Sequence, residues 1–334
     1  MALLTVEHLQ VDFRLRQQTL TALYDISFTL SPGERLAIVG ESGAGKSLLG
    51  YAIVNLLRQP GYISAGAIHF HEQNLTKLGS RQWQQIRGKK IAMIFQDPMV
   101  TLNPVLTVGE QMVEAIRAHQ KISAQAAKQL AIHKLSQVKI SAAEQRFEQY
   151  PHELSGGMRQ RVVIAIAMLL NPEILIADEP TTALDVTIQA QILHLLKQLC
   201  EEQGVALILI THDFGVVSRI AERTLVMYAG RIVERGPTLE IINDPQHPYT
   251  QGLLNALPQM ALAGQRLNQI PGHMPSLGEH PSGCAFHPRC PYATEKCRWQ
   301  RPRPIYSGIS TVACFAIEEL LAETNLEEGD DNHD

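Results

Sequence analysis

A glycine-rich segment at residues 40–47 has the residue types and spacing of a site for phosphate groups. It reads GESGAGKS, which matches the pattern G-x-x-x-x-G-K-S, and apolar runs precede and follow it. Strand, loop and helix in this order are the context that a phosphate-binding loop requires. Glycines let backbone N–H groups approach phosphate oxygens without a Cβ atom in the way. The residues expected around the phosphates are Gly40, Glu41, Ser42, Gly43, Ala44, Gly45, Lys46 and Ser47.

Two side chains of this loop have specific expected roles. Lys46 can reach the outer phosphates, and the Ser47 hydroxyl can ligate Mg²⁺. The positive end of the helix that follows adds attraction for an anion. A glycine turn that binds nothing is the alternative, and the predicted strand and helix on either side argue against it.

Two acidic residues follow an apolar strand further along the chain. Residues 174–179 read ILIADE, so Asp178 and Glu179 lie at the carboxyl end of this predicted strand. An aspartate in this place beside a phosphate loop can hold Mg²⁺. The adjacent Glu179 can accept a proton from an attacking water or orient that water. Two surface carboxylates at a strand end are the alternative interpretation.

Three further segments each carry a weaker signal. Residues 154–161 read LSGGMRQR, the signature segment, which offers a hydroxyl and backbone N–H groups to an anion at the start of a helix. Residues 183–185 read ALD, and residues 211–213 read THD after another predicted strand. Taken alone, each segment is equally consistent with a structural role. The candidate binding residues in them are Ser155, Gly156, Gly157, Asp185 and His212.

Together, and in this order, these segments resemble the nucleotide-binding subunits of ABC transporters, which use ATP and Mg²⁺. The resemblance covers residues 3–240, and the signature segment is its most specific part. It implies that Gln96 touches Mg²⁺ and the water, that His212 contacts the γ-phosphate, and that Asp185 helps to join two such domains. Phe13 falls where the family stacks an aromatic ring on adenine. A phenylalanine in the core of a strand is the alternative there.

The resemblance also implies a division of labour between two chains. In the family, two such domains meet head to tail, and each ATP lies between one phosphate loop and the opposite signature segment. This chain has one of each, so Ser155 and Gly157 are expected to serve the ATP of a partner. The implied partners are a homologous second ATPase subunit in a heterodimer, two transmembrane permease subunits and, indirectly, a periplasmic or extracellular solute-binding protein.

The order of predicted strands and helices indicates an α/β fold. Apolar runs typical of buried parallel strands alternate with helical stretches, and they lie at 36–39, 91–95, 174–177 and 206–210. Helical spacing of apolar residues covers 108–150. The resemblance implies a P-loop NTPase domain of the ABC type, with a parallel core sheet, an antiparallel β subdomain and a helical subdomain at about 98–160.

Composition changes near residue 245, where prolines become frequent and periodicity fades. We expect the nucleotide-binding domain at 1–245, a small cysteine-rich extension at 246–322 and an acidic, disordered tail at 323–334.

Segments 95–104, 150–154 and 245–258 resemble the oligopeptide/dipeptide importer branch of the family, most closely the first ATPase subunit of a dipeptide importer. The resemblance implies a motor subunit that couples ATP binding and hydrolysis to the uptake of di- or oligopeptides. Branch members also carry nickel chelates, haem, glutathione or antimicrobial peptides, so these cargoes remain alternatives. An ABC ATPase without a transport role is a rival, although such proteins usually carry two cassettes, a coiled-coil insertion or a basic surface.

Four of the five cysteines gather near the C-terminus, at Cys284, Cys290, Cys297 and Cys314. Thiolates can hold Zn²⁺ or an iron–sulfur cluster, and the spacing lacks the C-x2-C pairs typical of structural zinc. The similar extension in the family implies a [4Fe–4S] cluster, and zinc or four free thiols are the alternatives. We expect ATP binding to be independent of these cysteines, because the phosphate loop is assigned to a separate domain. Cys200, alone in an apolar helical stretch, is expected to be buried.

Charge and hydropathy limit the partners further. The net charge is -4, with 29 basic and 33 acidic residues, which gives no sign of a nucleic-acid surface. The longest strongly apolar run, 162–170, is far below the roughly 20 residues that span a bilayer. The first residues lack the pattern of a signal peptide. We therefore expect a peripheral protein on the cytoplasmic face of the inner or plasma membrane, with no nucleic-acid partner.

Overall fold

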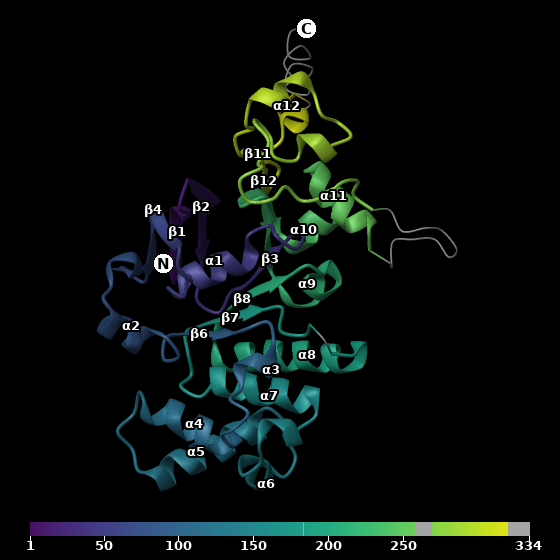
Figure 1. Cartoon of the computed structure of the whole chain (residues 1–334). Helices are drawn as coiled ribbons and strands as arrows, with labels where there is room; N and C mark the ends of the chain where they lie inside the picture. Colours follow the sequence, from purple (N-terminus) through teal and green to yellow (C-terminus); the bar gives the residue numbers. More distant parts are fainter. Residues whose placement is uncertain (183, 258–268, 320–334) are drawn as a thin grey trace. The chain divides into compact units, whose positions relative to one another are not determined.

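The computed structural model describes residues 1–182, 184–257 and 269–319 (Figure 1). Within these residues the chain forms two compact units, each assembled from segments that are far apart in sequence. Unit 1 comprises Met1–Leu4, Thr29–Arg35 and His69–Ile210. Unit 2 comprises Thr5–Phe28, Leu36–Ile68 and the described residues from Thr211 onward. None of the helices in the described ranges is both long and apolar enough to cross a membrane.

Unit 1 contains a parallel sheet with β7 at its centre. Its strands are β6 (Ile91–Ile94), β7 (Ile174–Asp178) and β8 (Ala206–Thr211). Every residue of β7 and β8 is buried, as expected for parallel strands that are covered on both faces. The carboxyl ends of parallel strands lie at one edge of a sheet, so the residues that follow β6 and β7 are brought close together.

Helices make up most of the rest of unit 1, and they confirm the helical region predicted at 108–150. Helix α4 begins with a capping box, in which the Thr107 hydroxyl accepts the Glu110 N–H and the Glu110 carboxylate accepts the Thr107 N–H. The elements are β5 (Gln73–Asn74), η1 (Leu75–Lys77), α2 (Ser80–Ile86), α3 (Pro98–Thr101), α4 (Val108–Arg117), α5 (Ala124–Gln137), α6 (Ala143–Phe147), η2 (Pro151–Glu153), α7 (Gly156–Ala167) and α8 (Val186–Gln203).

Unit 2 contains the sheet that carries the phosphate loop. Strand β3 (Arg35–Val39) runs parallel to β9 (Arg223–Tyr228), and β9 pairs antiparallel with β10 (Arg231–Pro237). Beyond β10, the order continues through β12 (Ser310–Val312) to β11 (Ile305–Ser307). Strands from the C-terminal residues therefore extend the same sheet that leads into the phosphate loop.

The remaining strands of unit 2 belong to a second sheet, and helices connect the strands of the unit. Strand β1 lies between β2 and β4 in a second sheet. The elements are β1 (Leu4–Arg14), β2 (Thr19–Leu30), β4 (Gly61–Phe70), α1 (Lys46–Ile53), α9 (Phe214–Ile220), α10 (Thr238–Asn243), α11 (Pro248–Asn255), η4 (His287–Arg289) and α12 (Glu295–Trp299).

One hydrophobic core joins the two sides of the boundary predicted at residue 245. Its buried members are Ala37, Val39, Phe214, Val217, Val226, Tyr228, Ala229, Ile241, Tyr249, Leu254 and Phe286. The described residues after 245 thus share a core with β3, which leads into the phosphate loop. The domain bounds stay a prediction, and the tail predicted at 323–334 lies outside the described residues.

Candidate functional site

The phosphate loop connects β3 to α1 within unit 2, and its shape depends on glycine. Gly40 has φ +157°, and a Cβ atom there would overlap the carbonyl oxygen of Met227 in β9. Gly45 has φ +98°, and a Cβ atom there would lie 2.7 Å from Leu23 Cδ2. Any larger residue would push the loop away from the strands beneath it. The sequence pattern therefore reflects a real packing constraint as well as room for phosphate oxygens.

Lys46 begins α1, and its ammonium group lies over the phosphate loop. The residue is only 5% exposed. Its Nζ donates to the carbonyl oxygens of Gly40 at 2.8 Å and of Glu41 at 2.9 Å. These bonds keep a positive charge beside the loop, where an outer phosphate would need it. Ser47 follows in the first turn of α1, which suits its predicted role as a Mg²⁺ ligand.

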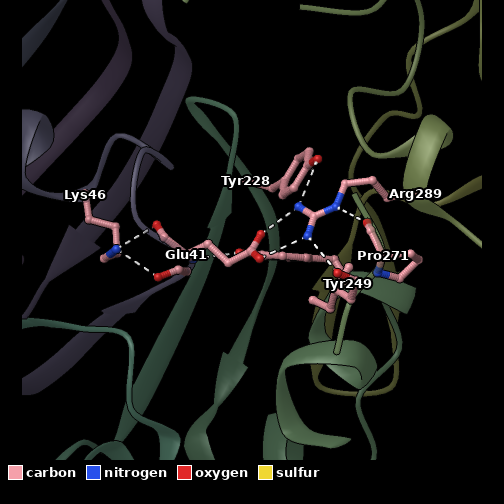
Figure 2. Close-up of polar contacts among 8 residues, drawn as sticks. Glu41, Lys46, Tyr228, Tyr249, Pro271 and Arg289 are labelled. Carbon is pink, nitrogen blue, oxygen red and sulfur yellow. Dashed lines mark hydrogen bonds and ion pairs between the residues drawn. The ribbon is translucent and has the colours of Figure 1, made fainter. Parts of the chain in front are cut away.

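Glu41 is held from three sides (Figure 2). Its N–H donates to Tyr249 Oη at 2.7 Å, and its carbonyl oxygen accepts from Lys46. Its carboxylate accepts from Arg289 Nη1 at 2.7 Å and Nη2 at 3.0 Å. The sequence identified Glu41 only as a loop residue and did not identify Tyr249 or Arg289. No local pattern marks these two residues, because each lies more than 200 positions from Glu41.

The predicted acidic pair lies in unit 1, at the end of β7. Asp178 is the last residue of the strand and is fully buried. Glu179 follows with φ +44°, a left-handed conformation that residues other than glycine seldom adopt. Its N–H donates to the carbonyl oxygen of Ile210 at 2.9 Å. Backbone strain of this kind is concentrated at functional sites, where the surrounding structure enforces it.

Two neutral donors hold the carboxylate of Glu179. Gln96 Nε2 donates to Glu179 Oε2 at 2.9 Å, and Thr182 Oγ1 donates to the same oxygen at 3.0 Å. The structure thus brings together Gln96 and Glu179, which the sequence predicted separately. Sequence reasoning missed Thr182. Both donors are uncharged, and they orient the carboxylate that the sequence predicted to act on the attacking water.

The signature segment forms the start of α7 in unit 1. Ser155 is the N-cap, and its Oγ accepts the N–H of Met158 at 3.3 Å. Gly156 and Gly157 are the first two helical residues. Ser155 and Gly156 are exposed, so the helix start is accessible from solvent. This placement suits the predicted second anion site at a helix N-terminus.

The structure gives Asp185 a local function. It is the N-cap of α8, and its Oδ1 accepts the N–H groups of Thr187 at 3.1 Å and Ile188 at 3.0 Å. This cap is compatible with the predicted role in joining two domains, which stays a prediction.

His212 and Phe13 both lie in unit 2. His212 is exposed and directly follows β8. Phe13 is half-buried in β1, with its ring close to Gly61. The predicted contacts of His212 with the γ-phosphate and of Phe13 with adenine stay predictions.

The geometry does not support the predicted [4Fe–4S] cluster. In the described parts of the chain, no three histidine, cysteine, aspartate or glutamate side chains are placed to hold a metal ion. The four cysteines are nevertheless neighbours. Burial raises the pKa of the Cys284 thiol to about 11, and Cys297, Cys314 and Cys290 act in the same direction. Without a cation the Cys284 thiol is protonated at neutral pH, whereas a metal requires thiolates.

Comparison with known proteins finds two family models in the chain. The ABC transporter model matches residues 23–182, and the model of the oligopeptide/dipeptide transporter C-terminal region matches residues 233–297. A similar protein is the dipeptide transport ATP-binding protein DppD of Haemophilus influenzae, 48% identical over 94% of this chain and 95% of that protein. Another is the oligopeptide transport ATP-binding protein AppD of Bacillus subtilis, which is 46% identical over 96% of this chain and 98% of that protein.

Solved structures resemble the chain as well. The ATP-binding cassette MJ0796, a dimer in a post-hydrolysis state with ADP and Pi, has a TM-score of 0.63 and 29% identity, and the match covers 70% of this chain and 98% of that one. The protein cbiO1 of Clostridium perfringens, part of the ABC transporter complex cbiONQ, has a TM-score of 0.63 and 27% identity. The match covers 73% of this chain and 91% of that one.

The cysteine environments predict slow alkylation in the folded protein. Cys200 is buried, as the sequence predicted, and burial raises its pKa to about 12. Since only the thiolate reacts, we expect iodoacetamide at pH 8 to leave Cys200 and Cys284 almost unlabelled in metal-free folded protein. Below these raised pKa values, the rate should increase about tenfold per pH unit. Mass spectrometry would measure it, with guanidinium-unfolded protein as the control; rapid labelling of Cys200 at pH 8 would contradict its placement.

Proposed function

Because the chain belongs to the ATP-binding proteins of the ABC transporter family, we propose that it is the ATP-hydrolysing subunit of a membrane importer for di- and oligopeptides. The main support is 48% identity to a dipeptide transport ATP-binding protein along 95% of that protein. The phosphate loop and the held carboxylate of Glu179 are the two parts that hydrolysis of a phosphoanhydride needs.

The predicted fold class is confirmed at the level of the ATP-binding cassette, with mixed α/β sheets. ATP and Mg²⁺ follow from this family. The finer division stays a proposal: an antiparallel β subdomain, a helical subdomain at about 98–160, a nucleotide-binding domain at 1–245 and a cysteine-rich extension at 246–322.

Binding of ATP would use the phosphate loop of unit 2. The backbone N–H groups of the loop and the Lys46 ammonium would contact the phosphates. Ser47, Gln96 and Asp178 would hold Mg²⁺, which supplies positive charge against the phosphate oxygens. The glycine loop and the buried position of Lys46 support this assignment, because glycines let backbone N–H groups approach phosphate oxygens and Lys46 keeps a positive charge beside them.

Hydrolysis would depend on Glu179. Its carboxylate would accept a proton from water as the water oxygen attacks the γ-phosphorus and the bond to ADP breaks. Gln96 and Thr182 would keep the carboxylate in one orientation. His212 would contact the γ-phosphate and steady it during the attack.

The active assembly would contain two cassettes. Ser155, Gly156 and Gly157 at the start of α7 would contact the ATP of a homologous partner subunit, and Asp185 would lie at that interface. The dimeric state of the similar MJ0796 cassette supports such pairing. Two transmembrane permease subunits would hold the pair at the cytoplasmic face of the membrane, and a solute-binding protein would act on them from the other side.

The cargo is proposed from the relatives' names and from the C-terminal family model. Both refer to dipeptides or oligopeptides. A nickel chelate, haem or an antimicrobial peptide remains an alternative cargo. An ABC ATPase without a transport role is disfavoured, since the match at residues 233–297 is to a transporter region.

We expect Glu179→Gln to separate ATP binding from hydrolysis. The amide keeps the size of the side chain but cannot accept a proton, so phosphate release by the assembled transporter should fall at least about 100-fold while ATP affinity is retained. Uptake of a radiolabelled dipeptide should fall with it. Thr182→Val should reduce turnover about tenfold, and Thr182→Ser should restore it. Near-normal turnover of Glu179→Gln would exclude the assigned base, and unchanged peptide uptake would exclude the transport role.

The metal group of the C-terminal segment stays a proposal from the sequence. We propose from the resemblance alone that Cys284, Cys290, Cys297 and Cys314 bind a [4Fe–4S] cluster, with Zn²⁺ as the alternative. The closeness of the four thiols supports this proposal, since the other three all raise the pKa of Cys284.

Elemental analysis of protein purified without oxygen tests the metal proposal. We expect about four iron atoms per chain and a broad absorption band near about 400 nm. Cys290→Ser should lose both signals, whereas Cys200→Ser should keep them because Cys200 lies elsewhere in the chain. About one zinc atom and no iron would replace the iron–sulfur assignment with zinc. Absence of any metal would contradict both.

A further inference from the structure

The ion pair between Arg289 and Glu41 joins the cysteine-containing segment directly to the phosphate loop (Figure 2). The guanidinium contacts both oxygens of the carboxylate, at 2.7 Å and 3.0 Å. The Arg289 side chain is only 5% exposed, and that of Glu41 is 30% exposed. A bidentate, largely buried ion pair of this kind is stronger and more directional than an ion pair on the surface.

Arg289 is fixed by its own segment and not by the loop alone. Its Nε donates to the carbonyl oxygen of Pro271 at 2.8 Å. The guanidinium lies 5.8 Å from the ring centroid of Tyr228 and 5.9 Å from that of Phe286. Arg289 is the last residue of η4, and Cys290 follows it directly. The position of the guanidinium therefore depends on the conformation of the segment that carries the cysteines.

The residue that Arg289 holds is central to the loop. The Glu41 N–H is bound by Tyr249, which is fully buried in α11, and the Glu41 carbonyl oxygen accepts from Lys46. A displacement of Glu41 would thus also move a hydrogen-bond partner of Lys46. The C-terminal residues Tyr249 and Arg289 together fix the entrance of the loop.

The charges of these groups predict the direction in which loss of Arg289 would change ATP binding. Glu41 places a carboxylate in a loop whose proposed ligand is a polyanion, and like charges at such short range repel each other. Arg289 neutralises this carboxylate and directs it away from Lys46 (Figure 2). Without the guanidinium, the negative charge would remain beside the phosphate site and oppose binding.

We propose that Arg289 is a positioning residue for the phosphate loop, through which the C-terminal segment sets the affinity of the loop for ATP. The proposal rests on the proposed function, since it assumes that ATP is the ligand. It also revises the expectation that ATP binding is independent of the cysteine-containing segment. The two are in direct contact within one compact unit.

ATP binding to full-length variants tests the proposal, with calorimetry in the presence of Mg²⁺ as the measurement. Arg289→Gln should raise the Kd for ATP about tenfold. Added salt should reduce this difference in Kd between the variant and the wild type, because salt screens the charge of the Glu41 carboxylate. The double variant Glu41→Gln/Arg289→Gln should recover most of the affinity, since the opposing carboxylate is gone. The Kd of Arg289→Lys should lie between those of the wild type and Arg289→Gln, because an ammonium group keeps the positive charge but cannot make the bidentate contact.

Arg298→Gln is the matched control, because Arg298 is exposed in the same segment, and it should bind ATP like the wild type. Thermal unfolding would verify that each variant is folded. If Arg289→Gln fails to fold, the comparison of Arg289→Lys with the wild type decides, and equal affinity overturns the proposal. So does a folded double variant that binds no better than Arg289→Gln. Failure of the wild type itself to bind ATP would instead overturn the proposed function.

Discussion

The phosphate loop must present backbone N–H groups to a compact anion, and much of unit 2 serves that constraint. Gly40 lies so close to the Met227 carbonyl that a side chain there would displace the loop from β9. Lys46 is buried against two loop carbonyl groups. Glu41, the one acidic side chain of the loop, is turned toward Arg289. Packing thus determines the backbone path of the loop. Hydrogen bonds hold the Lys46 ammonium beside the loop, and the ion pair with Arg289 neutralises Glu41.

Unit 1 holds Glu179, the carboxylate that we propose as the base, in a fixed orientation. The left-handed backbone of Glu179 is strained, and the hydrogen bond from its N–H to Ile210 helps to hold it. Gln96 and Thr182 then fix the carboxylate through neutral donors.

The sequence predicted what is local in the chain and missed what is distant. The glycine pattern, the acidic pair at the end of β7 and the helices at 108–150 depend on neighbouring residues, so their spacing revealed them. Arg289 is 248 positions from Glu41, and only the folded chain makes them partners. Thr182 lies near Glu179, yet a threonine three residues from a carboxylate has no specific pattern. The cysteines were expected to form a cluster, but spacing alone cannot fix the geometry that a metal needs.

Peptide-dependent ATP hydrolysis by the assembled transporter in liposomes tests the central claim most directly. The chain, its partner ATPase subunit and the permease subunits would be reconstituted together, and phosphate release would be measured with and without a peptide-loaded solute-binding protein. The account predicts that the loaded binding protein raises the rate several-fold and that the isolated monomeric chain stays far slower. A rate that does not respond to peptide, or a monomer as fast as the full assembly, would contradict it.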